Sequence, residues 1–213
     1  MARRIKILES AKQLQVKILF ELKRVVSKLF KTKAAKLETR AKLIIERYLT
    51  TSNTLRELMG GKLQKDFGLT DALANRAVLD IISAVVNSVN IVFDSQSRNL
   101  VGSVKINLLP TDITAITGLS SGSYINDGKE GGDIDWLLWL LTRGTQVVIG
   151  EYSVEYGLFP TTRSGGARMI EGGSFRVDPE HAGTIDDNFI TRAIQAASPE
   201  IIEIIKTELQ KGN

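Results

Sequence analysis

The chain has 213 residues, of which 43% are hydrophobic and 24% charged; this is the composition of a folded protein and excludes wholesale disorder. The absence of cysteine excludes disulfides and thiolate metal sites, and no apolar run approaches the roughly 20 residues of a membrane-spanning helix. The basic N-terminus lacks the uninterrupted apolar core of a signal peptide, so we expect a protein that is made in the cytoplasm and has no membrane partner.

Charge is distributed unevenly along the chain. Residues 1–47 contain 14 Lys and Arg against 4 Glu, a net charge of +10. The remaining 166 residues contain 14 Lys and Arg against 20 Asp and Glu, net −6, and the two parts give the overall +4. Such segregation indicates an acidic partner for the N-terminal segment, which is either nucleic acid or the acidic face of a protein.

The first predicted element is a helix from Arg3 to about Tyr48. Apolar residues recur there every three or four positions, no proline or glycine interrupts them, and the apolar stripe is broader than a coiled-coil seam. A helix of this length would extend about 65 Å, more than the width of a domain of this size. We therefore expect it either to break near Lys31-Thr32-Lys33, where the stripe lapses, or to project and find neighbours.

The same helix carries most of the positive charge. Its cations form either a solvated face or a surface that contacts an acidic protein or the backbone of DNA. The basic residues that we select as candidates for such contacts are Arg3, Arg4, Lys6, Lys12, Lys17, Lys23, Arg24 and Lys28. Because neither zinc-finger spacing nor aromatic interleaving accompanies them, contact with DNA would be non-specific and sensitive to salt.

Shorter helices are predicted next. Thr50–Asn53 is a polar break that offers N-cap residues, and short helices follow at Leu55–Leu58 and Lys62–Gly68, separated by a glycine pair. Thr70-Asp71 caps a further helix over about Ala72–Asn87. The apolar stripe of this helix predicts that it belongs to the core.

The spacing of apolar residues then changes from helical to alternating. Val89–Phe93 and Leu100–Leu109 are predicted strands joined by a turn, and Thr111-Asp112 caps a short helix. Ser120–Gly132, rich in Gly and Ser, is predicted to be a loop or a loosely held hairpin. Asp133–Thr142 holds both tryptophans and is apolar on all sides, so we expect it to be buried, either within the subunit or between subunits.

A second hairpin is predicted in the C-terminal third. A strand runs through Gln146–Ile149 into Glu151–Gly157, and Arg163–Gly166 forms the turn into a returning strand at Ala167–Ile170. The pair Gly172-Gly173 predicts another turn, which leads into residues 175–177.

The last helix is expected to begin at Asp187 or Asn188, with a new start or a kink at Ser198-Pro199. Together the elements predict an α+β fold: long N-terminal helices, an antiparallel β-sheet of hairpins and a closing C-terminal helix. We divide the chain into a long basic helical segment (1–50) and an α+β domain (51–213).

No catalytic constellation is found in the sequence. The single histidine, His181, lies in a predicted loop without a recognisable nucleophile beside it. The pairs Asp133/Asp135 and Asp186/Asp187 suit a helix N-terminus as well as a hard cation, and the glycine pairs lack the pattern of a phosphate loop. We therefore expect no enzymatic activity, no cofactor and no metal.

Short motifs in the C-terminal third carry a family resemblance. Val154-Glu155-Tyr156-Gly157, an irregular segment, His181-Ala182-Gly183-Thr184 and a helix that opens at Asp187-Asn188-Phe189 together resemble the tail-completion (head–tail joining) proteins of long-tailed bacteriophages. In that family a glutamate–aromatic–glycine strand end precedes a Pro-Phe-x-x-x-Ala helix start, and here Asn188 stands in place of the proline. Arg163–Met169 and Phe175–Glu180 also look like segments of other phage virion structural proteins.

The resemblance implies a structural virion protein that is assembled in the host cytoplasm. Such a subunit would form a ring, six-fold or twelve-fold, between the capsid portal or adaptor and the tail, with DNA as a non-specific neighbour in the channel. A tail terminator or another tail structural protein is the alternative within this class, and a non-specific DNA-binding accessory protein is the alternative outside it. The candidate contact residues are Glu155, Arg163, Arg168, Phe175 and Arg192, for each of which an intramolecular role is the alternative.

Overall fold

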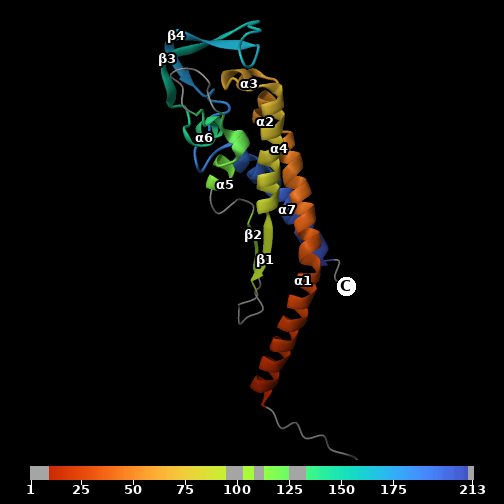
Figure 1. The fold of residues 1–213 in the computed structure, drawn as a ribbon. Coiled ribbons are helices and arrows are strands. Elements are labelled where there is room, and N and C mark those ends of the chain that lie inside the picture. Colours follow the sequence, from red (N-terminus) through yellow and green to blue (C-terminus); the bar gives the residue numbers. More distant parts are fainter. Residues whose placement is uncertain (1–9, 95–102, 108–112, 125–132, 211–213) are drawn as a thin grey trace, which may run out of the picture.

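A computed structural model describes residues 10–94, 103–107, 113–124 and 133–210. Its longest element is α1 (Ala11–Thr50), a single helix of 40 residues that runs along the molecule and projects beyond it (Figure 1). Ser10 caps this helix: its hydroxyl accepts the N–H of Gln13, whose side chain accepts the N–H of Ser10. The helix does not break at residues 31–33, so the projecting alternative is the one that the structure adopts.

Three shorter helices follow, as predicted. They are α2 (Asn53–Leu58), α3 (Lys62–Asp66) and α4 (Asp71–Ser88). The hydroxyls of Ser52 and Thr70 accept backbone N–H groups at the starts of α2 and α4, which satisfies donors that have no partner within the helix.

The middle of the chain contains a small sheet and short helices. Strands β1 (Asn90–Asp94) and β2 (Ser103–Asn107) pair antiparallel, as the alternating pattern predicted. They are followed by α5 (Thr114–Thr117), a 3₁₀ turn η1 (Ser120–Gly122) and α6 (Trp136–Thr142). The predicted capping pair at 111–112 and most of the predicted loop at 120–132 lie outside the described residues.

The second hairpin pairs β3 (Val147–Tyr156) with β4 (Ala167–Arg176). The turn predicted at Gly172-Gly173 is wrong, because β4 continues through both glycines. The register there passes from Gly150↔Ser174 to Tyr152↔Glu171, which leaves one residue of β3 opposite two of β4. The glycines adopt φ of 99° and 88°, values that favour glycine, and they accommodate a bulge where the sequence had suggested a turn.

The closing helix, α7 (Phe189–Gln210), begins where the sequence predicted. Asn188 caps it, since its Oδ1 accepts the N–H groups of Ile190 and Thr191 at 3.0 and 3.1 Å. No second helix starts at Pro199, which lies inside α7.

The core lies where α1, α4 and α7 run side by side, and it extends to α6 and the β3–β4 hairpin (Figure 1). In α6 the side chains of Trp136, Leu137, Leu140 and Leu141 are buried within the subunit. Phe67 links the helices to the hairpin: its ring centroid is 5.7 Å from that of Trp136 and 6.2 Å from that of Phe175. The predicted α+β class is confirmed, although the strands form two separate two-stranded sheets.

Candidate assembly interface

The two ends of α1 have different surroundings. Near its C-terminus one face enters the core, and Leu37, Ala41, Ile45 and Leu49 are at most 3% exposed. From Ser10 to Lys36, no side chain that the structure describes is buried. We call residues 11–31 the free segment of α1 and residues 37–49 its anchored segment.

The free segment exposes large apolar side chains. They are Val16 (61% exposed), Ile18 (55%), Phe20 (67%), Leu22 (46%) and Val25 (50%). Burying apolar surface is worth about 25 cal/mol per Å², so a neighbour that covered this helix would gain stability from each of these side chains. Ile18, Leu22 and Val25 share one face of the helix, and exposed apolar residues grouped in this way mark an interaction site in a folded protein.

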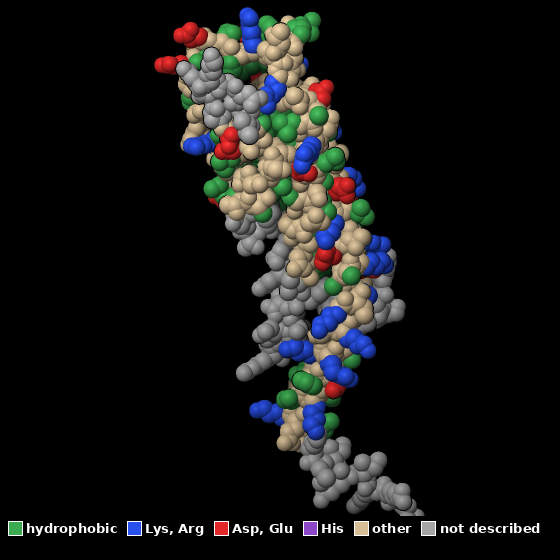
Figure 2. Space-filling model, in the orientation of Figure 1, with side chains coloured by type: hydrophobic (Ala, Val, Ile, Leu, Met, Phe, Trp, Pro, Cys, Tyr) green, Lys and Arg blue, Asp and Glu red, His purple; other side chains and the backbone are tan. Residues whose placement is uncertain are grey.

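The free segment is also basic. Figure 2 shows Lys and Arg side chains gathered along this projecting part of α1, beside hydrophobic ones. Six cations stand against one acid, Glu21, which pairs with Arg24 at 2.9 Å: the cations are Lys12, Lys17, Lys23, Arg24, Lys28 and Lys31. The sequence-predicted Arg3, Arg4 and Lys6 lie outside the described residues.

The cations and part of the apolar residues occupy different faces of the free segment. At 3.6 residues per turn, Lys17, Lys28 and Lys31 fall within an arc of about 60°, together with Arg24. With Lys12 and Lys23 included, the six cations span an arc of about 160°, and Leu14, Ile18, Leu22 and Val25 lie on the arc opposite. The exposed side chains of Val16 and Phe20 lie among the cations. The segment can therefore pack one face against an apolar surface while the other meets negative charge.

An ionic cluster holds α1 where the free segment leaves the core. The Glu208 side chain of α7 is buried, and its carboxylate accepts from Arg40 at 2.7 Å and from Lys36 at 3.2 Å. Lys33 donates to the Glu208 carbonyl at 2.6 Å. The cluster ties the last turn of α7 to α1 and so fixes the direction in which the free segment projects.

This cluster was not predicted from the sequence. Lys33, Lys36 and Arg40 recur at three and four residues and therefore share one helix face, which was a visible signal. Their partner, Glu208, lies 168 residues from Arg40 along the chain. Nothing in its local sequence distinguishes it from a solvated glutamate of α7.

Four of the five predicted contact residues are surface groups with partners inside the subunit. Glu155 accepts from Arg168 at 2.6 Å, and the Arg168 guanidinium lies 4.5 Å from the ring centroid of Phe159. The Arg163 guanidinium stacks over Tyr124 at 4.1 Å.

The other two predicted contact residues lie near the start of α7 and in the core. Arg192 donates to Asp187 at 2.7 Å, which lowers the pKa of Asp187 below its usual value. Phe175 is 6% exposed and packs on Phe67, so in this structure it has the intramolecular alternative role. The structure pairs Glu155 with Arg168 and places Arg163, Arg168 and Phe175 around one recess, whereas Arg192 lies apart from it.

The single histidine and a buried carboxylate also have partners within the subunit. His181 is buried, and its Nδ1 lies 3.2 Å from the Thr54 hydroxyl. The Asp66 carboxylate accepts a hydrogen bond from Tyr156, and burial is the main cause that raises the pKa of both groups. This pair joins α3 to β3 and gives no sign of a nucleophile.

The two acidic pairs do not gather into a metal centre. In the part of the chain that the structure describes, no three His, Asp or Glu side chains group in a way that could hold a metal ion. Asp135 precedes α6 without a side-chain cap hydrogen bond, and Asp187 pairs with Arg192. Within the same described residues, no helix has the length and apolarity that crossing a membrane requires.

Comparison of the chain with protein-family models, with curated proteins and with solved structures gave no match.

Proposed function

We propose that the protein is a structural virion subunit of a tailed bacteriophage, a ring-forming neck component that joins the capsid portal or adaptor to the tail. The observation that carries this proposal is the free segment of α1, which exposes apolar side chains that no described part of its own subunit covers. A projecting helix of this kind is stable in water only marginally by itself, so it favours a protein that works within an assembly.

The resemblance to tail-completion proteins supports the choice of assembly. Val154–Tyr156 forms the end of β3, Gly157 follows it, and His181–Thr184 leads into the cap of α7. Asn188 caps the helix at the position where the family has proline, so this difference has a local structural explanation.

The two faces of the free segment suggest how it would act. Its apolar face would pack on an adjacent copy, and its basic face would meet an acidic adaptor surface or the phosphates of DNA in the channel. The role is one of binding and contains no catalytic step. A tail terminator would use the same contacts at the other end of the neck.

A second candidate is a DNA-binding accessory protein that acts alone. The basic arc of Lys17, Arg24, Lys28 and Lys31 favours it, because phosphates require only positive charge on one face. A DNA-binding role does not explain why the free segment exposes an apolar face. It predicts tight, salt-dependent binding of DNA by the isolated monomer.

The test is the mass of the purified full chain, measured by light scattering alone and with purified capsid connectors. We expect six-fold or twelve-fold assembly in at least one condition. A persistent monomer in both conditions would overturn the proposal. DNA binding by that monomer at moderate salt would then favour the accessory protein.

A matched pair of variants identifies the surface responsible. Ile18 and Leu43 lie on α1 and are 55% and 61% exposed, but only Ile18 is in the free segment. We expect Ile18→Ser to weaken assembly by at least about tenfold in concentration, and Leu43→Ser to leave it within about twofold. Equal effects of the two variants would remove the free segment from the proposal.

A further inference from the structure

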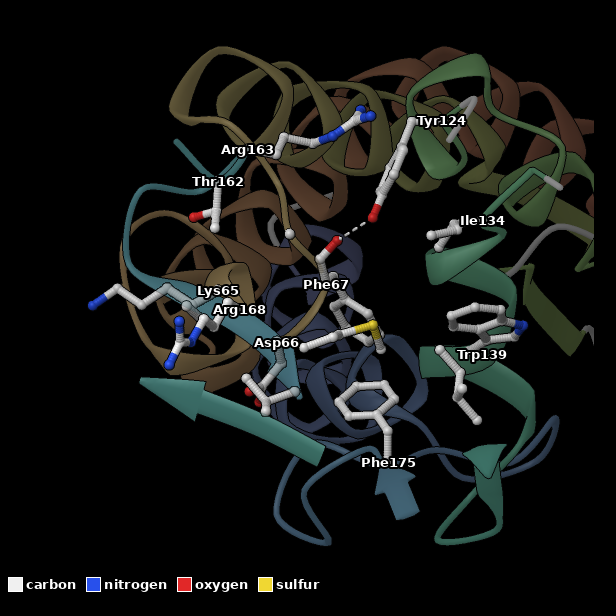
Figure 3. A pocket seen from close by; sticks show the side chains of 15 residues that line it. Lys65, Asp66, Phe67, Tyr124, Ile134, Trp139, Thr162, Arg163, Arg168 and Phe175 are labelled. Atoms are coloured by element: carbon white, nitrogen blue, oxygen red, sulfur yellow. Dashed lines mark hydrogen bonds between the residues drawn. The ribbon is translucent and has the colours of Figure 1, made fainter. Parts of the chain in front are cut away.

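A recess opens between the β3–β4 hairpin, α3 and α6. Its volume is about 380 Å³. Figure 3 shows Phe67, Ile134, Trp139 and Phe175 arranged around it, contributed by segments far apart in the sequence. This volume is at the lower end of the range of small-ligand sites, roughly 300–1,000 Å³, and it suits one large side chain.

The walls of the recess are apolar and incompletely covered. Phe67 and Phe175 are buried, but Trp139, Ile149 and Val154 are only half-buried, and Met169 is 47% exposed. The subunit thus leaves aromatic and aliphatic surface in contact with solvent at a concave site, where a partner side chain would bury it.

Side chains around the recess are held in place. The Tyr124 hydroxyl donates to the carbonyl of Phe67 at 2.9 Å, as the dashed line in Figure 3 marks. The rings of Phe67 and Phe175 meet edge to face, with an interplanar angle of 81°. A site whose walls are fixed in this way loses little conformational entropy when it is filled.

The rim of the recess is cationic. Lys65, Arg163 and Arg168 line it, against the single carboxylate of Asp66. Arg168 already pairs with Glu155, whereas Lys65 has no ion pair among the residues that the structure describes. A ligand with carboxylates beside its apolar group would therefore find a complementary charge at the rim.

We propose that this recess binds one large apolar side chain from an acidic segment of a partner protein. The basic free segment of a second copy is the wrong occupant, since its lysines would meet the cationic rim. The proposal uses none of the residues of the free segment. It can therefore hold or fail independently of the neck function.

The proposal requires a large apolar side chain and negative charge beside it, and three peptides test these two requirements. They are acetyl-Glu-Glu-Phe-Glu-amide, its lysine counterpart acetyl-Lys-Lys-Phe-Lys-amide, and acetyl-Glu-Glu-Ala-Glu-amide. The readout is ¹⁹F NMR of the full chain labelled with 5-fluorotryptophan, because the chain has only two tryptophans. Trp139 lines the recess, while Trp136 is fully buried, donates to the Ser121 carbonyl at 3.1 Å and serves as the internal control.

We expect the acidic phenylalanine peptide to shift the Trp139 signal in a saturable way and to leave Trp136 unchanged. The lysine peptide and the alanine peptide should each bind at least about fivefold more weakly. Equal affinity of the two phenylalanine peptides would overturn the charge requirement, and equal affinity of the two acidic peptides would overturn the apolar one.

Two valines of β3 provide a matched pair of variants. Val154 lines the recess, and Val147 in the same strand lies outside it and is 47% exposed. Val154→Phe should fill the recess and reduce peptide affinity at least about fivefold, while Val147→Phe should not. If Val154→Phe has the wild-type circular dichroism and thermal transition yet still binds normally, the recess is not the site.

Discussion

The free and anchored segments of α1 are parts of one continuous helix with similar apolar spacing and different surroundings. In the anchored segment Ile45 is 0% exposed, while in the free segment Ile18 is 55% exposed. The difference teaches that apolar periodicity specifies a helix with a face to bury, but does not specify what buries it. The apolar face of the anchored segment is buried by α4 and α7. In our proposal the apolar face of the free segment is buried by another subunit.

The largest contrast should be in amide hydrogen exchange. A helix without tertiary contacts opens at little cost, whereas the anchored segment opens only when the core does. In the monomer we expect amides of residues 16–28 to exchange at least about 100-fold faster than those of residues 41–49. Equal protection of the two segments in a monomer would contradict the comparison. A gain of protection in residues 16–28 on assembly would support the proposed interface.

The next contrast uses one substitution in the two segments. Ile45→Ala should lower the free energy of unfolding by about 2–5 kcal/mol, because it leaves a cavity in the core. Ile18→Ala should change that free energy by at most about 0.5 kcal/mol, because its side chain is mostly solvated in the monomer. Urea denaturation at a protein concentration below the assembly threshold measures both.

The junction between the segments can be weakened separately. Glu208→Gln removes the charge that Lys36 and Arg40 share, and we expect it to cost about 1–3 kcal/mol, since the two cations keep access to water. Glu203→Gln, at an exposed position of α7, is the control and should cost at most about 0.5 kcal/mol. Equal losses in urea denaturation would mean that the cluster does not hold the junction.

The smallest contrast is between two ion pairs within α1. Glu38 and Lys42 pair at 2.7 Å with about a third of each side chain exposed, while Glu21 and Arg24 pair at 2.9 Å and are 59% and 72% exposed. We expect Lys42→Gln to cost about 0.3–0.5 kcal/mol and Arg24→Gln less than about 0.2 kcal/mol. Thermal unfolding at low and high salt would sharpen the comparison, since salt should reduce the larger effect.

Most elements were predictable because their signals are local. The hydroxyls of Ser52 and Thr70, the Asn188 amide and the alternation in β1 act over three to five residues, so spacing alone located these helices and strands. The bulge of β4 was missed for the same reason. Two glycines predict a turn locally, and only pairing with β3 makes them part of a strand.

The candidate sites were only partly predictable. The basic and apolar character of the free segment was evident from the sequence, but its exposure was not. Three residues of the recess, Arg163, Arg168 and Phe175, were among the predicted contact residues. The recess itself was not predicted, because Phe67, Trp139 and Phe175 come from separate parts of the chain and carry no common motif. The predicted contact residues Phe175 and Arg192 found partners within the subunit, which their neighbouring residues in the sequence did not reveal.

The sequence by itself determined an α+β chain with a long, uninterrupted, basic N-terminal helix, since helix propensity, capping and charge are properties of neighbouring residues. Only the tertiary structure decided which part of that helix is buried in the core. The boundary lies where α7 ends, because Glu208 pairs there with Lys36 and Arg40. From Lys36 back to Ser10, no described part of the subunit buries a side chain of α1. Burial depends on contacts between residues distant in the chain, and no local pattern encodes them.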